Sequence, residues 1–191
     1  TPVITAGQMI DTAFCSGVVV NLPDYQTVPI GAQLNWVNSN TTIGLGSSGN
    51  GQIPNFTAST NNNQNTSGTI TVEAAFNNCT NTIDTVVIQV NANPSFTEFI
   101  NPTSGLNCQF DPIEIGVNYT NPGQISWNGP GIIGPNNSNS IQINLDGIYY
   151  FNLTELSTGC TSSDSIFVEA PDVISLNSLA TSNVKCFSGN D

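Results

Sequence analysis

One short hairpin pattern occurs twice in this sequence, and it constrains the fold more than any other feature. Each copy contains a cysteine, a threonine, a few small polar residues, an aspartate followed by a hydroxyl residue, and then an apolar strand. The similar spacing of further landmarks indicates a repeated unit of about 80 to 95 residues. Three pairs of landmarks are separated by 81, 91 and 93 positions, respectively: Cys79 and Cys160, Trp36 and Trp127, and Cys15 and Cys108.

The repeat divides the chain into two small domains followed by the start of another. We expect a first domain at residues 1–93, a second at 94–170, and a connector with the beginning of a third repeat at 171–191. Short runs of alternating apolar and polar residues predict strands, and no window of a dozen residues has helical spacing. The sequence therefore predicts an all-β chain of two tandem β-sandwiches with essentially no helix.

The strands have individually predictable positions. A loop-rich stretch is expected at 38–68, and Trp36, on a central strand, is expected to fill the first core. A tight turn at Asn77 and Asn78 should open the first copy of the hairpin. The expected strands are 1–5, 17–22, 32–37, 69–76, 96–100, 112–117, 124–127, 140–145, 148–156 and 164–168.

The charge composition excludes two classes of partner. The chain has thirteen acidic residues, one basic residue (Lys185) and no histidine, for a net charge of −12. Nucleic-acid binding and attachment to anionic lipid both need clustered lysine or arginine, so neither is expected. No apolar stretch approaches the roughly 20 residues that a membrane-spanning helix needs, so no membrane insertion is expected.

The same composition argues against catalysis. Without histidine, no Ser/His/Asp or Cys/His arrangement can form, and zinc sites lose their commonest nitrogen ligand. Two acids suffice for a glycosidase, but the acids here are scattered singly along the chain. Isopeptide cross-links would need a lysine inside each unit, and residues 1–184 contain none. We expect no enzyme activity.

Calcium is the cofactor that an acid-rich chain most readily binds, through carboxylate and carbonyl oxygens. The nearest acidic clusters are Asp111 with Glu114, and Glu169 with Asp172, and no Asp-x-Asp-x-Asp loop occurs. Solvated acids explain these clusters more simply. We expect no cofactor, with calcium as the alternative.

Several motifs resemble those of known surface proteins. Residues 15–17, 36–38 and 43–58, with the hairpin that begins at Cys79, resemble the PKD-like domain of large secreted proteins of the Bacteroidetes. Residues 94–170 resemble the related Ig-like units, through the motifs at 127–131, 147–149 and 159–161, so the resemblance implies two tandem Ig-like/PKD-like β-sandwich domains. The final six residues, Cys186-Phe187-Ser188-Gly189-Asn190-Asp191, are similar to the opening of the repeat of SprB-type gliding-motility adhesins.

This resemblance implies a non-catalytic segment of a large cell-surface adhesin, exported by type IX secretion and associated with the outer membrane. The segment would be monomeric and would act as a spacer or present a ligand, with neighbouring repeats and surface polysaccharide as candidate partners. The alternative is a carbohydrate-binding or spacer module of a secreted polysaccharide-degrading enzyme. Carbohydrate binding would need exposed aromatic side chains, and the candidates are Tyr25, Tyr119 and Tyr150.

An extracellular location would keep cysteines oxidised. Four cysteines allow three pairings, and we expect Cys15 to pair with Cys79 and Cys108 with Cys160, because only this choice keeps each bridge inside one unit. The fifth, Cys186, should be a free thiol in this segment, with its partner beyond the last residue.

Two smaller motifs complete the predictions. The sequences Asp-Thr-Ala, Asp-Thr-Val and Asp-Ser-Ile, at 11–13, 84–86 and 164–166, resemble the Bacteroidetes O-glycosylation signal and make Thr12, Thr85 and Ser165 candidate sites. The simpler explanation is that such pairs begin strands well. Residues 146–149 are typical of a sandwich corner in which the hydroxyl group of Tyr149 bonds to the upstream backbone.

Overall fold

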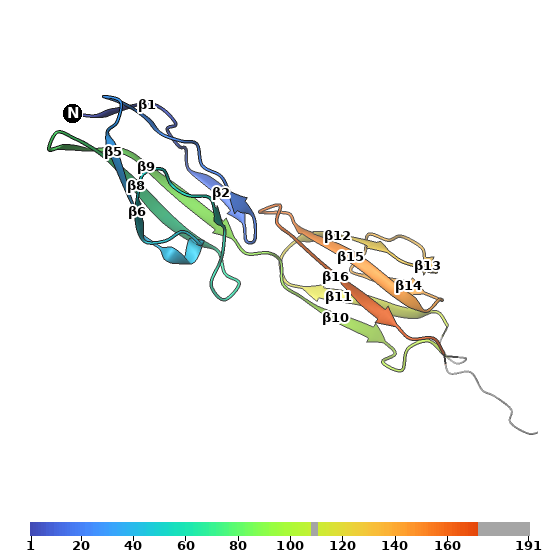
Figure 1. Cartoon of the computed structure of the whole chain (residues 1–191). Coiled ribbons are helices and arrows are strands. Elements are labelled where there is room, and N and C mark those ends of the chain that lie inside the picture. The colour runs from blue at the N-terminus through green and yellow to red at the C-terminus, as the bar shows by residue number, and fades with distance from the viewer. Residues whose placement is uncertain (108–110, 172–191) are drawn as a thin grey trace, which may run out of the picture.

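The computed structural model describes residues 1–107 and 111–171, apart from the side chains at positions 82 and 83. Figure 1 shows two β-structured units arranged end to end. Within the described ranges the only helical element is a single 3₁₀ turn, η1 (Thr41–Ile43). The all-β prediction is therefore confirmed. Below, residues 1–93 are called the first unit and residues 94–171 the second unit.

The first unit is built on one five-stranded sheet of order β2-β9-β8-β5-β6, in which β2 runs parallel to β9 and the other pairs are antiparallel. Two short two-stranded sheets, β1-β4 and β3-β7, complete it. The strands are β1 (Val3–Ala6), β2 (Thr12–Cys15), β3 (Val19–Val20), β4 (Gln26–Val28), β5 (Gln33–Asn38), β6 (Ser48–Asn50), β7 (Phe56–Thr57), β8 (Thr66–Phe76) and β9 (Cys79–Asn91).

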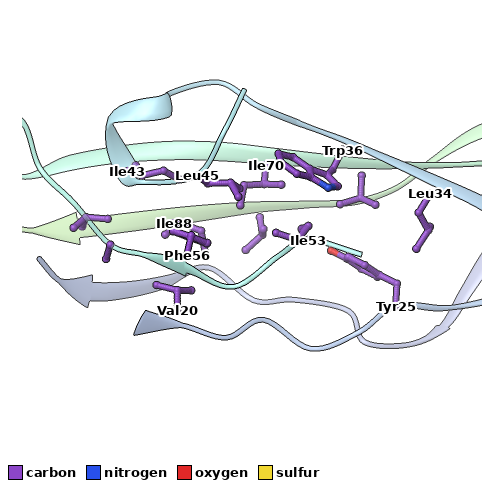
Figure 2. Close-up of a cluster of buried hydrophobic side chains, with 14 of the residues drawn as sticks. Val20, Tyr25, Leu34, Trp36, Ile43, Leu45, Ile53, Phe56, Ile70 and Ile88 are labelled. Atoms are coloured by element: carbon purple, nitrogen blue, oxygen red, sulfur yellow. The ribbon is translucent and has the colours of Figure 1, made fainter. Parts of the chain in front are cut away.

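The core of the first unit follows from strand periodicity. Every second residue of β5 is buried, because successive side chains of a strand point to opposite faces. Trp36 is only 5% exposed, as predicted for a core residue. Figure 2 shows the cluster of buried hydrophobic side chains that forms this core. Trp36 of β5 and Ile70 of β8 lie on one side of the cluster, and Val20 of β3 lies on the other. Ile88 and Phe56 lie between the two sides.

The long β8–β9 hairpin turns at Asn77 and Asn78, as predicted. Both residues have positive φ, 50° and 63°. A tight hairpin turn with two such residues matches the twist of its strands, and asparagine tolerates this conformation better than other residues with a Cβ. The hairpin therefore places Cys79, the first residue of β9, at its tip.

The second unit packs two antiparallel sheets, β10-β11-β14-β13 and β12-β15-β16. Trp127 and Phe151 are buried between them, with ring centroids 5.1 Å apart. Phe96 meets Phe151 edge to face at 4.9 Å. The strands are β10 (Phe96–Asn101), β11 (Ile113–Tyr119), β12 (Gly123–Asn128), β13 (Ile132–Ile133), β14 (Ser140–Ile143), β15 (Gly147–Glu155) and β16 (Thr161–Val168).

The predicted corner is present. The hydroxyl group of the fully buried Tyr149 donates a hydrogen bond to the backbone carbonyl of Leu145. Burial raises the pKa of Tyr149, and the negative charge of Asp146 raises it further, so the hydroxyl keeps its proton and remains a donor.

The strand predictions for the first unit need correction, and β4 was not among them. Residues 17–22 were expected to form one strand, but only Val19 and Val20 do, because Gly17 at φ 91° turns the chain beforehand. The preceding strand, β2, was not predicted, and it joins the sheet through a parallel pairing with a distant segment. The expected loop at 38–68 contains η1, β6 and β7 as short elements.

Candidate functional sites

The structure contains one disulfide within the described residues, and it joins the two units. Cys15 is bonded to Cys160, with Cα atoms 5.5 Å apart and 145 positions between them in sequence. The predicted pairing of Cys15 with Cys79, and of Cys108 with Cys160, is therefore wrong. Cys79 is an exposed free cysteine. Cys108 and Cys186 lie outside the described residues, so the prediction for Cys186 is not tested.

The geometry of β9 explains why Cys15 cannot bond Cys79. Cys79 is the first residue of β9, whereas Cys15 pairs with Asn91, the last. A strand of this length separates its ends by roughly 40 Å, while a disulfide needs Cα atoms within about 7 Å. Cys15 therefore lies at the end of the first unit that faces the second, and Cys79 lies at the opposite end.

Two covalent connections cross the joint between the units. The first is the chain itself, in which only residues 92–95 separate β9 from β10. The second is the disulfide from the end of β2 to Cys160, which precedes β16 and is fully buried. Figure 1 shows the turn between β15 and β16 lying beside the end of β2. Two separate covalent connections restrict the relative motion of the two units far more than a single linker would.

Hydrogen bonds reinforce the joint. The side-chain amide of Asn93 donates to the carbonyl of Ser16 at 3.2 Å, and the hydroxyl group of Ser162 donates to the carbonyl of Pro94 at 2.7 Å. The Ser16 backbone N–H donates to the carbonyl of Asn91 at 2.9 Å. The linker residue Asn93 is thus hydrogen-bonded to the first unit, and the linker residue Pro94 is hydrogen-bonded to the second.

A buried carboxylate lies next to this joint. Glu155 is 8% exposed, and its two oxygens accept from Asn121 at 2.6 Å and from Thr158 at 2.8 Å. The small cavity beside it, lined in part by Pro94 and Tyr119, has a volume of about 10 Å³. A cavity of this size has room for about one water molecule and none for a larger ligand. Glu155 therefore acts as a structural acceptor.

The aspartate-hydroxyl pairs of both hairpin copies are also explained by structural hydrogen bonds. The Asp84 carboxylate accepts hydrogen bonds from the Tyr25 hydroxyl group at 2.8 Å and from the Met9 backbone at 2.9 Å. It also accepts from the backbone N–H of Thr85, and the Asp164 carboxylate accepts from Ser165 in the same way. Burial, followed by the hydrogen bond and charge of Asp84, raises the pKa of Tyr25.

The three candidate O-glycosylation residues differ in accessibility. Thr85 is exposed on β9, whereas Thr12 on β2 and Ser165 on β16 are half-buried. Modification of any of them stays a prediction, and Thr85 is the most accessible of the three.

The acidic clusters do not converge. Within residues 1–107 and 111–171, no three acidic, cysteine or histidine side chains come together as a possible metal site. Asp111 and Glu114 are in the described part, whereas Asp172, the expected partner of Glu169, is outside it. One acidic pair that the sequence did not suggest is Glu98 with Asp164: burial raises the pKa of Glu98, and the charge of Asp164 raises it further.

An open groove lies at the end of the first unit away from the joint. It has a volume of about 520 Å³ and is lined by Tyr25, Gln26, Gln52 and seven uncharged neighbours. The side-chain amide of Gln52 bonds both the N–H and the carbonyl of Tyr25, so it holds the wall of the groove. The lining carries no carboxylate and no thiol, and therefore no pair of groups for acid–base chemistry.

The three tyrosines that were candidates for carbohydrate contact differ in their exposure to solvent. Tyr25 is buried at 5% exposure, so the expectation that it is exposed was wrong. Tyr119 is half-buried and donates to the side chain of Asn139 at 2.6 Å. Tyr150 is 56% exposed. A fourth aromatic residue that the sequence analysis missed, Phe167, is 62% exposed, because it points outward between the buried Ile166 and Val168.

Tyr150 and Phe167 belong to one surface, which we call the aromatic face. It is the outward side of the sheet β12-β15-β16 in the second unit. Its members alternate with buried residues along β15 and most of β12, and along β16 from Ser165 onward. They are Gln124, Ser126, Asn128, Ile148, Tyr150, Asn152, Thr154, Thr161, Ser163, Ser165 and Phe167.

In the described part of the chain, no helix is both long and apolar enough to cross a bilayer.

Comparisons with known proteins give structural likenesses only. No protein-family model matches the chain, and neither does any curated protein. A C-terminal fragment of intimin, solved in complex with the intimin-binding domain of the translocated intimin receptor, has a TM-score of 0.44 at 8% identity and covers 72% of this chain and 51% of its own. The four N-terminal Ig domains of Dscam1 score 0.30 at 15% identity, covering 85% and 44%. Cadherin domains 1–4 of protocadherin gamma B7 score 0.30 at 13% identity, covering 88% and 49%.

The chain spans about half the length of these structures or less. Likenesses of this size do not identify a function or a partner for it.

Proposed function

We propose that this chain is a rigid, non-catalytic segment of an extracellular adhesin, in which two β-sandwich units form a stiff spacer. The observation that carries the proposal is the Cys15–Cys160 disulfide across the joint between the units. A bridge inside each unit would stabilise that unit's fold, whereas a bridge between units fixes their relative orientation. Stiffness is useful where a segment must hold a terminal binding site away from a cell surface.

The disulfide also supports the extracellular location. Disulfides persist in oxidising environments and are rare in the reducing cytosol of most organisms. The negative charge and the absence of lysine, arginine and histidine from residues 1–184 argue against nucleic acid and anionic membranes as partners.

The assignment of this chain to a particular type of adhesin rests on the sequence motifs alone. We propose that the parent protein is a gliding-motility adhesin of the SprB type, exported by type IX secretion and associated with the outer membrane. Neighbouring repeats of the same chain would then be the immediate partners, and no enzyme activity or cofactor is proposed. The second candidate, a module of a secreted polysaccharide-degrading enzyme, is favoured by one observation, the aromatic face of the second unit.

The test of rigidity compares the orientation of the two units with and without the bridge. Residual dipolar couplings are measured for the oxidised chain, for a Cys15→Ser, Cys160→Ser double variant, and for a Cys79→Ser variant as the matched control. We expect both units of the oxidised chain and of the control to fit a single alignment tensor, and the double variant to need two.

The proposal fails if the oxidised chain already needs two tensors, because the units would then move independently despite the bridge. It also fails if the double variant behaves like the oxidised chain, since the disulfide would then be irrelevant to the orientation.

A further inference from the structure

We propose that the aromatic face of the second unit binds an uncharged polysaccharide, with Tyr150 and Phe167 stacking on sugar rings. This site lies on β15 and β16, away from the residues that hold the joint, and it does not depend on the stiffness of the segment. A negative result in the rigidity experiment would leave the binding proposal unaffected. A negative result in the binding experiment would likewise leave the rigidity proposal unaffected.

The strand register brings the apolar members of this face together. Phe167 on β16 lies directly opposite Ile148 on β15, and Tyr150 is the next outward residue on β15. Ile148 is 44% exposed, so the register places three exposed apolar side chains at neighbouring positions of this surface. Tyr150 and Phe167 are the only aromatic side chains more than about a third exposed among the described residues. Apolar clusters on the surface of a soluble domain commonly mark interaction sites.

The charge of the face selects the class of partner. None of the outward residues within β12, β15 and β16 is acidic or basic, but two exposed acids, Asp146 before β15 and Glu169 after β16, border the face. Asp164, on the same strand as Phe167, alternates to the other side of the sheet, where its negative charge raises the pKa of Glu98. The face itself offers no ion pair to a charged partner, and the acids at its border repel an anionic polymer, so a neutral polysaccharide is the partner that we propose.

The polar neighbours supply the matching hydrogen bonds. Tyr150 lies between Asn128 on β12 and Ser165 on β16, and the next row places Asn152 between Ser126 and Ser163. Amides and hydroxyls both donate and accept, as do the hydroxyls of a sugar. An aromatic ring presents an electron-rich face to which the C–H groups of a sugar ring are complementary. Rings bordered by neutral amides and hydroxyls therefore fit a carbohydrate better than a charged polymer.

The equivalent surface of the first unit shows that these features are not general to the chain. The outward side of β5, β8 and β9 carries the acid Glu73 and no aromatic residue, and its apolar members include Val37 and Val87. A flat sheet surface alone therefore does not produce the cluster. This surface provides a control site in the same molecule.

The test is affinity electrophoresis of the whole chain in gels that contain laminarin, hydroxyethylcellulose or galactomannan, with alginate as the anionic control. We expect at least one neutral polysaccharide, but not alginate, to retard the protein. Tyr150→Ala and Phe167→Ala should each weaken retardation by about tenfold, the effect of losing one aromatic stacking contact. Val37→Ala on the first unit should leave it unchanged.

A further variant separates stacking from a structural effect. Tyr150→Phe keeps the ring and should keep binding, and thermal unfolding of every variant checks that the exposed substitutions leave the fold intact. The proposal is overturned if no neutral polysaccharide retards the chain, if both alanine variants bind normally, or if Tyr150→Phe loses as much as Tyr150→Ala. Self-association that is abolished by Phe167→Ala, without any retardation, would assign the face to a second copy and also overturn it.

Discussion

At the scale of single residues, buried polar groups hold both units in place. Tyr25 and Tyr149 are each buried, and each hydroxyl group has an acceptor: the Asp84 carboxylate in the first unit and the Leu145 carbonyl in the second. A buried hydroxyl without a partner costs free energy, so these two bonds specify where the neighbouring segments lie.

The bond between Tyr25 and Asp84 should be measurable. Tyr25→Phe removes a hydrogen bond to a charged acceptor, so we expect the free energy of unfolding of the first unit to fall by about 1.5 kcal/mol in urea denaturation. Tyr150→Phe removes an exposed hydroxyl and should change stability by less than about 0.5 kcal/mol. Equal effects of the two substitutions would show that the Asp84 bond contributes nothing.

Glu98 should make the stability of the second unit depend on pH. Burial, and then the charge of Asp164, raise its pKa in the folded protein, so the folded protein binds this proton more tightly than the unfolded chain. Stability therefore falls as pH rises from the usual range of a glutamate towards the raised pKa and beyond. We expect Glu98→Gln to raise the melting temperature at pH 7 and to have a smaller effect near pH 3.

The control for this measurement is Glu73→Gln, which removes one acid from the first unit. If both substitutions change the melting temperature equally at pH 7, overall charge and not the local pair is responsible.

At the scale of elements, the β8–β9 hairpin organises the first unit. Its strands carry the centre of the five-stranded sheet, and its length places Cys79 at one end and Asn91 at the other. The turn at Asn77 and Asn78 has the positive φ angles that set the register of both strands.

The turn gives a prediction at this scale. Asn78→Val places a β-branched residue at φ 63°, which we expect to cost about 1–2 kcal/mol in urea denaturation. Asn78→Gly removes the strain of a side chain at this angle and should be neutral or slightly stabilising. A destabilising glycine substitution would show that the asparagine side chain, and not the backbone angle, matters here.

At the scale of the whole molecule, the joint decides how the two units behave together. A four-residue connection alone would leave the angle between them free, but the disulfide and the hydrogen bonds of Asn93 and Ser162 add constraints on both sides of the linker. These constraints support the proposal that the two units, arranged end to end in Figure 1, form one stiff segment.

Peptide mapping tests the bridge directly. A non-reducing digest of the native protein should contain a peptide pair joined through Cys15 and Cys160, and iodoacetamide should alkylate Cys79 before unfolding because its side chain is exposed. A peptide pair joined through Cys15 and Cys79 would contradict the structure and restore the bridge within one unit.

Features that depend on local pattern could be predicted from the amino-acid sequence. Alternation along strands gave the all-β class, the burial of Trp36 and the turn at Asn77 and Asn78, and a short motif gave the Tyr149 corner. Each of these depends on residues close together in the chain, so a short window contains the whole signal.

Contacts between residues far apart in the chain could not be predicted in this way, because they depend on how the folded units pack. Cys15 bonds Cys160 because the end of β2 and the β15–β16 turn meet at the joint, and a repeat spacing carries no information about contacts between units. Phe167 faces solvent although it lies in the apolar run Ile166-Phe167-Val168. Because all three residues are apolar, the sequence shows no alternation of apolar and polar residues that would indicate which side chains point outward. Long-range pairing, and the side of a strand that another sheet covers, are set by packing in three dimensions.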